Sequence, residues 1–290
     1  MMEIVERKVL LSVGEHYRTA SARVMEPEGE VRVTILYFHR FGGHSLEFVG
    51  PAQALVAAGC RVVCLEMLGH PASEWLAPEE YDPTQNIELA RSLVADYAKA
   101  PFVLIGNDWG AHVALRAAPR NEPNMIGMFL FDYVNSVRFE TDIIMPLERA
   151  IALIKAESHE AFEAQMSRLA HPLGGIGVLI AAQARSRAHE INGRVGTFVD
   201  PAAYKPFCDE PQKIFSSGHL VMSQPCSVMM VNGHLATFKN HQMPTDPDVT
   251  FPETLHFISS QRLGYLNWRG EAEGILEFLR ARDIVPKTRK

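Results

Sequence analysis

The sequence predicts an α/β protein built on a mostly parallel sheet, with a helical insertion in its second half. Two observations support this class. Short apolar runs alternate with helical patterns over residues 31–131, and the strand signal fades between about residues 135 and 218. Short apolar strands separated by helices are typical of parallel sheets that are covered on both faces. We therefore expect one core domain, residues 1–134 and 219–290, and a helical cap, residues 135–218.

The elements of the first half follow one another in a simple order. Residues 8–13 and 22–25 alternate apolar and polar side chains on either side of a turn, which predicts an antiparallel hairpin. Strands and helices then alternate, and Thr84 is the expected N-cap of the second helix. The expected strands are 31–38, 61–65, 102–105 and 126–131, and the expected helices are 46–58, 84–100 and 111–118.

The second half begins with the expected cap. Residues 147–156 and 161–169 have helical patterns, and Pro172 and several glycines follow them. Strand patterns return at residues 227–231 and 248–251, and the last helix is expected over residues 269–282. Apolar residues inside the cap are candidates for a substrate pocket or for ordinary packing: Ile176, Val178, Leu179, Ile180 and Phe198.

Composition excludes several functional classes. With 47% hydrophobic residues and a formal net charge of -6, the chain fits neither a disordered protein nor a nucleic-acid binder. No apolar run approaches the roughly 20 residues that cross a bilayer, and the first residues lack an apolar signal core. We expect a cytoplasmic protein without a membrane partner. The cysteines lack metal-site spacing and are expected to be buried free thiols: Cys60, Cys64, Cys208 and Cys226.

The sharpest motif is Gly106-Asn107-Asp108-Trp109-Gly110, which lies between a short apolar strand and a helix. This is the setting of a nucleophile elbow, in which small flanking residues let a tight turn lift the central side chain above the sheet. The central residue here is a carboxylate. An aspartate in water has a pKa of about 4, so it is ionised at neutral pH and can attack carbon directly. The alternative is a glycine-rich turn in which Asp108 is only an N-cap.

Attack by Asp108 on a saturated carbon would leave an ester, and water must then hydrolyse that ester. A histidine after the last strand would activate the water, and His256 follows residues 248–251 and precedes the last helix. His234 is a weaker candidate. No metal or other cofactor is expected for this chemistry.

A carboxylate should orient the catalytic histidine. Asp132 directly follows the strand 126–131, at the edge of the sheet where ligands bind in open α/β folds. Asp246 and Asp248 are alternatives because both precede His256 in the chain. A cap at the exit into the helical insertion is the other interpretation of Asp132.

Backbone N–H groups should stabilise the negative charge on the ester carbonyl. They normally come from the residue after the nucleophile and from a loop after an earlier strand, positions that Trp109 and Phe41 occupy. The Trp109 indole N–H can also face a departing halide or alkoxide, although packing explains this large ring equally well.

Several ordered segments resemble the aspartate-nucleophile branch of the α/β-hydrolases, namely the haloalkane dehalogenases and epoxide hydrolases. The aspartate–tryptophan pair of the elbow is the most specific of them. The segments are residues 38–42, 65–69, 106–111, 131–133 and 255–258. The resemblance implies the α/β-hydrolase fold and a small apolar organic substrate.

Differences within this branch bear on the substrate. Asp132 matches one subgroup of dehalogenases, which usually carries asparagine two residues after the loop histidine, where this chain has Phe41. Epoxide hydrolases tend to carry phenylalanine there, and their cap supplies tyrosines that protonate the epoxide oxygen. Tyr204 lies inside the expected cap and Tyr133 at its base. Together with two residues of the loop before Phe41, they are the expected substrate-binding residues: His39, Arg40, Tyr133 and Tyr204.

The resemblance thus predicts a hydrolase that acts through an aspartyl ester. Carbon–halogen hydrolysis is the first hypothesis, and hydrolysis of an epoxide to a diol is the alternative. An ester or another activated carbon is a further substrate class. Arg40 in the loop also favours an alternative hypothesis, in which the protein has this fold but binds a small ligand without turnover.

Overall fold

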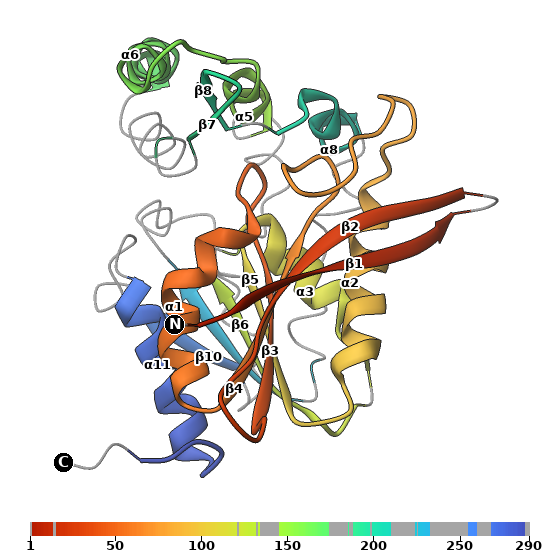
Figure 1. The fold of residues 1–290 in the computed structure, drawn as a ribbon, viewed down its shortest axis with the longest axis vertical. Coiled ribbons are helices and arrows are strands. Elements are labelled where there is room, and N and C mark those ends of the chain that lie inside the picture. The colour runs from red at the N-terminus through yellow and green to blue at the C-terminus, as the bar shows by residue number, and fades with distance from the viewer. Residues whose placement is uncertain are drawn as a thin grey trace, which may run out of the picture.

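The computed structural model describes residues 2–13, 16–120, 122–131, 133, 145–173, 185, 188–197, 199–209, 224, 226–232, 255–259 and 268–287. These residues form an eight-stranded sheet with the strand order β1-β2-β4-β3-β5-β6-β9-β10, and helices cover both of its faces (Figure 1). The expected α/β-hydrolase fold, with a mostly parallel sheet flanked by helices, is confirmed.

The sheet combines an antiparallel edge with a parallel body. The hairpin of β1 and β2 is longer than the sequence pattern predicts, because the two strands pair along all ten residues of each. Only β2 joins the body in antiparallel pairing, through β4. The strands are β1 (Ile4–Val13), β2 (His16–Met25), β3 (Val33–Phe38), β4 (Cys60–Glu66), β5 (Phe102–Asn107), β6 (Met125–Phe131), β9 (Ser227–Asn232) and β10 (Leu255–Ser259).

Two pairs of helices cover the sheet. One face packs against α1 (Val49–Ala57), which follows the short helix η1 (Ser45–Phe48), and α11 (Trp268–Ala281). The other packs against α2 (Pro83–Tyr97) and α3 (Trp109–Ala117). Since successive strand side chains point to opposite faces, neighbouring residues such as Ile35 and Leu36 join different clusters of the core.

The start of α2 differs from the prediction by two residues. Asp82, rather than Thr84, occupies the N-cap, and its Oδ1 accepts a hydrogen bond of 2.7 Å from the Thr84 N–H. The side-chain oxygen of Gln85 accepts one of 3.4 Å from the Asp82 N–H, which completes a capping box. Pro83 follows at the first helical position, where its missing N–H costs nothing.

The expected cap region contains helices and a small hairpin. Its helices lie together beyond one end of the sheet (Figure 1). The hairpin was not predicted, although the Asn192-Gly193 pair, with φ of 53° and 72°, is a turn signal. The described elements are α5 (Met145–Ala152), α6 (His159–Ala170), η3 (His171–Leu173), β7 (His189–Ile191), β8 (Arg194–Gly196), η4 (Pro201–Tyr204) and α8 (Lys205–Asp209).

Several expectations fall outside the described residues. They are the cap limits at 135 and 218, the strand expected over residues 248–251, and the candidate pocket residues Ile176, Val178, Leu179, Ile180 and Phe198. Cys60, Cys64 and Cys226 are buried free thiols, as predicted, and the Cys208 side chain is not described. In the described part of the chain, no helix has the length and apolar character needed to span a membrane.

Candidate active site

The elbow at Asp108 has the expected strand–turn–helix setting. Asp108 follows the last residue of β5 and precedes α3, with φ of 52° and ψ of -113°. Its N–H donates to the Phe131 carbonyl of β6 at 2.8 Å, and its carbonyl accepts from the Ala111 N–H at 3.0 Å. The Asp108 side chain makes no capping hydrogen bond to α3, so the N-cap alternative is not supported.

Two glycines permit this turn. A Cβ atom on Gly106 would overlap the backbone of Gly110 and Ala111, and a Cβ atom on Gly110 would overlap the carbonyl oxygens of Phe38 and His39. The strand, the helix start and the end of β3 therefore approach one another more closely than any side chain allows. This close approach is the physical reason for the small residues on both sides of Asp108.

Phe41 brings together three separate parts of the chain. Its buried ring packs edge-on against Trp109 of α3, with centroids 6.5 Å apart, and against Tyr204 of η4, with centroids 4.3 Å apart. Trp109 and Tyr204 are completely buried. Three predicted site residues, Phe41, Trp109 and Tyr204, therefore lie together beside the elbow. Tyr204 contacts Phe41 from the expected cap.

His39 ties two loops together. Its Nδ1 donates to the Arg40 carbonyl at 2.7 Å, and its Nε2 accepts from the Met67 N–H at 3.1 Å. Complete burial lowers the pKa of His39 to about 4, so the ring is neutral at pH 7. Because backbone groups occupy both ring nitrogens, the structure does not support the predicted substrate-binding role of His39.

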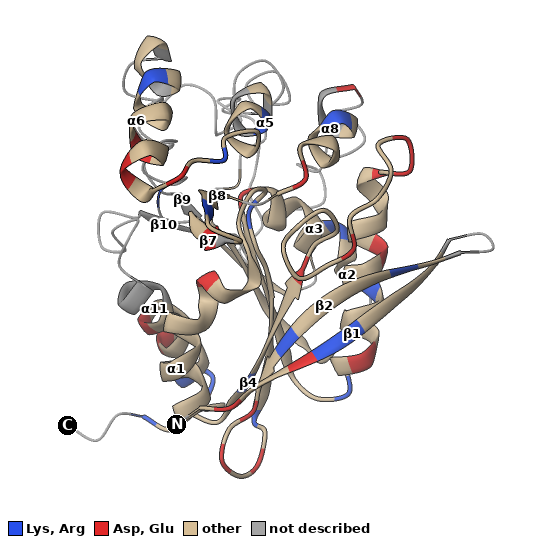
Figure 2. Ribbon diagram, turned by 45° about the horizontal axis from the view of Figure 1, so that its top comes forward, with Lys and Arg blue, Asp and Glu red and all other residues tan. Residues whose placement is uncertain are grey.

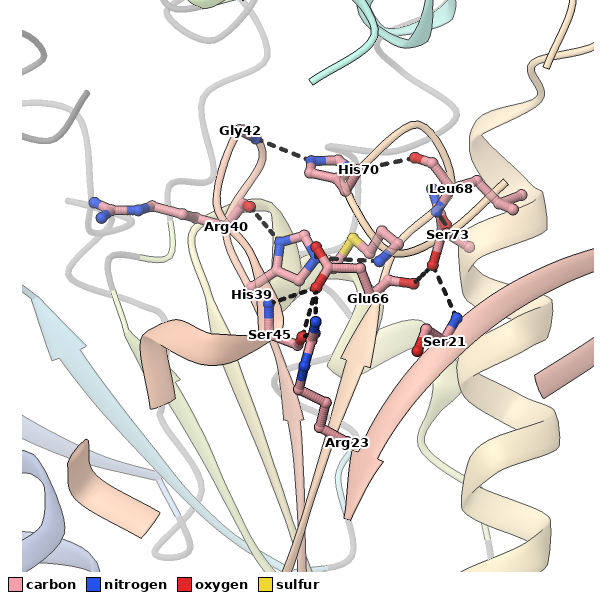
Figure 3. Close-up of polar contacts among 12 residues, drawn as sticks. Ser21, Arg23, His39, Arg40, Gly42, Ser45, Glu66, Leu68, His70 and Ser73 are labelled. Carbon is pink, nitrogen blue, oxygen red and sulfur yellow. Dashed lines mark hydrogen bonds and ion pairs between the residues drawn. The ribbon is translucent and has the colours of Figure 1, made fainter. Parts of the chain in front are cut away.

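His70 makes the reciprocal tie in the loop after β4. Its Nδ1 donates to the Leu68 carbonyl at 3.0 Å, and its Nε2 accepts from the Gly42 N–H at 3.2 Å (Figure 3). Burial lowers its pKa to about 3. The two imidazole rings stand 4.7 Å apart. The sequence analysis missed His70, although it directly follows the segment 65–69 that was part of the family resemblance.

A buried carboxylate lies beneath the two histidines. Glu66 Oε2 accepts from the Ser45 N–H at 3.0 Å and from the Arg23 guanidinium at 2.8 Å (Figure 3). Its other oxygen, Oε1, lies 3.8 Å from His39 Nε2. Glu66 is 1% exposed, so this network holds the loop after β3 from inside the protein. Nothing in the sequence pattern predicted it, because its members come from three distant segments.

Arg40 also has a partner within the protein. The residue is buried, and its Nη2 lies 3.4 Å from Glu47 Oε1. Its side chain points away from His70 (Figure 3). The predicted role of Arg40 in substrate binding would have to compete with this internal ion pair.

Tyr133 packs on the helix that follows the elbow. Its ring lies 4.7 Å from that of His112, and His112 lies 6.4 Å from Trp109. All three rings are buried. Tyr133 therefore lies near the start of α3. Its neighbour Asp132, the predicted acid, lies outside the described residues, as do Asp246, Asp248 and His234.

The structure places His256 differently from the prediction, in which it follows the last strand. His256 is the second residue of β10 and is level with Met229 of β9, which is level with Phe129 of β6 and Ile105 of β5. Asp108 is thus three residues farther along and three strands away. These steps correspond to roughly 14 Å across the sheet and about 10 Å along it. Strand pairing therefore places the His256 backbone in the same sheet as the elbow, three strands from Asp108.

No metal site emerges beside these residues. Within the described ranges, no group of three or more His, Cys, Asp or Glu side chains could hold a metal ion. The site consists of a carboxylate at the elbow, a ring of buried aromatic residues and two loops that neutral histidines hold.

The strand order and the strand–turn–helix elbow at Asp108 are those of an alpha/beta hydrolase. A family model for the alpha/beta hydrolase family matches residues 35–228, and the chain belongs to that family.

Solved structures with the same fold include other hydrolases. A Rickettsia typhi protein described as a hydrolase is 14% identical, with 97% of this chain and 99% of that chain covered and a TM-score of 0.66. E-2-(acetamidomethylene)succinate hydrolase is 16% identical, with 96% and 100% covered and a TM-score of 0.65. An alpha/beta hydrolase from Novosphingobium aromaticivorans is 16% identical, with 89% and 90% covered and a TM-score of 0.62. No curated protein matches the chain.

Proposed function

We propose that this alpha/beta hydrolase uses Asp108 as a nucleophile that attacks carbon and is transiently esterified. The observation that carries this proposal is the backbone of Asp108, held at a φ of 52° at the head of α3 without a capping role. A non-glycine residue in such a conformation costs about 1–3 kcal/mol, and strain of this kind clusters at functional sites.

The first step forms a bond from an Asp108 carboxylate oxygen to the substrate carbon. The bond from that carbon to its leaving group breaks, and the leaving group takes the electron pair. Water then adds to the carboxylate carbon of the ester and loses a proton to a base. Collapse of this intermediate breaks the ester bond to the substrate oxygen, which takes the proton back from the base and leaves as an alcohol. The Asp108 carboxyl group then loses its proton to solvent and is again a carboxylate.

Two backbone N–H groups are proposed to stabilise the negative charge in the second step. Gly42 donates to His70 and Gly43 donates to the Arg40 carbonyl, so both are committed within the loop. The N–H of Phe41 is therefore the proposed donor of this loop, together with that of Trp109. The reciprocal histidine ties would keep the loop in place.

The leaving group divides the proposal into two reactions. A halide would leave from a haloalkane, and the buried Trp109 supports this reaction. An epoxide would instead open and take up a proton. Tyr204, whose ring packs on Phe41 at 4.3 Å, supports epoxide opening because a phenol beside the site can donate that proton. Epoxides are therefore the first substrates to test.

Mass spectrometry in heavy-oxygen water tests the nucleophile. Single turnover with epoxide and haloalkane panels should place the heavy oxygen on Asp108 and leave the first product unlabelled. Asp108→Asn should lose about 10⁴-fold in activity, whereas the exposed Asp209→Asn should match the wild type. A first product labelled from water, or an adduct on another residue, would reject the proposal.

The same experiment decides the role of His256. If His256 is the base, His256→Ala should accumulate the ester on Asp108. A variant that hydrolyses the ester as fast as the wild type does would exclude His256 as the base. An ester that accumulates on Asp108 in this variant would identify His256 as the base.

A specific observation favours a second candidate function, ligand binding without turnover. His39 and His70 both lie near the elbow, and backbone groups occupy both nitrogens of each ring. Neither can accept a proton from water without losing a loop contact. Saturable binding of an epoxide or haloalkane in calorimetry, with no diol or halide formed and no ester detected, would select this candidate.

A further inference from the structure

β1 forms an edge of the eight-stranded sheet, and it is long and regular. It pairs with β2 through ten consecutive residues without a shift in register. Within the described part of the chain, no strand pairs with its outer edge. A regular edge presents a row of N–H and C=O groups to which another strand can bond, and proteins usually interrupt such edges with bulges or keep them short. This edge has neither feature; charged side chains are a further protection that proteins use at edges, and those of β1, Glu6, Arg7 and Lys8, carry both signs.

The solvent face of β1 has a self-complementary pattern. Alternate residues point to the same face, and on this face they read Ile4, Glu6, Lys8 and Leu10. Ile4 and Leu10 are 39% and 56% exposed, and the Glu6 and Lys8 side chains, which form an exposed ion pair of 3.1 Å with each other, are 48% and 58% exposed. Acidic and basic segments lie next to each other on the strand (Figure 2). When a second copy of this strand runs in the opposite direction, each apolar residue of the pattern faces an apolar residue, and each acidic residue faces a basic one.

We propose that β1 pairs with the same strand of a second copy, antiparallel, about a two-fold axis at Arg7. The two sheets would then join into one. A two-fold axis perpendicular to the sheet places one residue opposite its own copy, and residues that face each other lie on the same face. With Arg7 on the axis, Glu6 lies opposite Lys8 of the partner subunit, and Ile4 lies opposite Leu10 of the partner subunit.

The neighbouring registers lack this match. An axis at Glu6 sets two glutamates against each other and Ile4 against a lysine. An axis at Lys8 sets two lysines against each other and Glu6 against Leu10. On the other face of the strand, the Arg7 axis also brings Val5, which is 40% exposed, opposite Val9 of the partner subunit. Charge and hydrophobic pairing therefore select the same register.

Arg7 limits the strength of this dimer. The two Arg7 side chains lie directly opposite each other at the axis, and like charges in that position are destabilising. We therefore expect a dimer that dissociates on dilution. Arg7→Thr should make it tighter, because threonine removes the repulsion and favours strand structure.

Sedimentation velocity of the full chain over a dilution series tests the proposal. Wild type should show a concentration-dependent dimer. Glu6→Lys and Lys8→Glu should each weaken it by roughly tenfold, because two attractive pairs become repulsive. An equal mixture of these two variants should form heterodimers about as tight as wild type, since every lysine again faces a glutamate.

Glu160→Lys in α6 is the matched control, because it makes the same charge change at an exposed site and should leave the dimer unchanged. Circular dichroism would establish that each variant is folded. A wild type that stays monomeric up to its solubility limit, or a dimer that survives both charge reversals, would overturn the proposal. Failure of the mixed variants to pair would also overturn it. None of these outcomes bears on Asp108 chemistry.

Discussion

The two sides of the Asp108 elbow are built in different ways. On the β3–β4 side, His39 and His70 tie the loops to each other, and Glu66 supports them from below. On the β9–β10 side, His256 lies near the start of a strand, below the level of the elbow. The comparison shows that buried side chains hold the loops on one side of the elbow, whereas strand pairing sets the position of the backbone on the other.

This difference has a physical basis. The β3–β4 side depends on buried hydrogen bonds, each of which is costly to leave unmade. The β9–β10 side depends on strand pairing, and a slip of one residue there turns every side chain to the other face. Perturbing the first side should therefore damage stability, whereas changes on the second side should be milder.

The largest effect is expected from Glu66→Gln. This change leaves the Arg23 guanidinium, whose side chain is only 15% exposed, without its charged partner. Breaking a buried ion pair in this way should cost about 4 kcal/mol in the free energy of unfolding, measured in urea. Glu26→Gln, which breaks the exposed pair with Arg61, should cost less than about 1 kcal/mol. Equal losses in the two variants would show that the buried network does not stabilise the β3–β4 side.

Gly110→Ala should destabilise the protein by about 3 kcal/mol, because the new methyl group overlaps carbonyl oxygens at the end of β3. The same substitution should reduce any activity that depends on Asp108, since the helix start must move away. Urea unfolding measures the first effect, and the substrate panels measure the second. An alanine variant as stable and active as wild type would contradict the close approach of β3 and α3.

Acid should weaken the β3–β4 side through His39. Its pKa in the folded protein is about 4, below the usual histidine value of 6.5, so the unfolded chain binds a proton more readily. Stability should therefore be complete above pH 6.5 and fall as the pH decreases toward 4, by up to about 3 kcal/mol. His39→Gln keeps an acceptor for Met67 but does not titrate, so its stability should vary less with pH. If the free energies of unfolding of the two proteins varied with pH in the same way, His39 would not contribute to the loss of stability in acid.

The smallest effect is expected from a substitution in α11, on the sheet face opposite α2 and α3. Gly274 lies inside α11, and a Cβ atom there would meet no atom within 4 Å. Gly274→Ala should raise the free energy of unfolding by about 1 kcal/mol, because alanine favours the helix. A loss of stability would mean that the surroundings of α11 are tighter than described, and would weaken the contrast with Gly110.

Local patterns explain which elements could be predicted. The strand 102–105 and the elbow are recognisable because their signals lie within a few neighbouring residues. The N-cap of α2 was misplaced by two residues because Asp82 and Thr84 both suit that position. The Glu66 network was missed because Arg23, Ser45 and Glu66 are far apart in the chain and meet only through the sheet.

The sequence by itself determined the α/β class, the alternation of strands and helices, and the aspartate at the elbow, since each depends on short-range geometry and residue type. Tertiary structure alone decided that His39 and His70 bind backbone and that Tyr204 reaches Phe41. It also decided the level of His256 in the sheet. Pairing between distant strands sets that level, and no local pattern contains it.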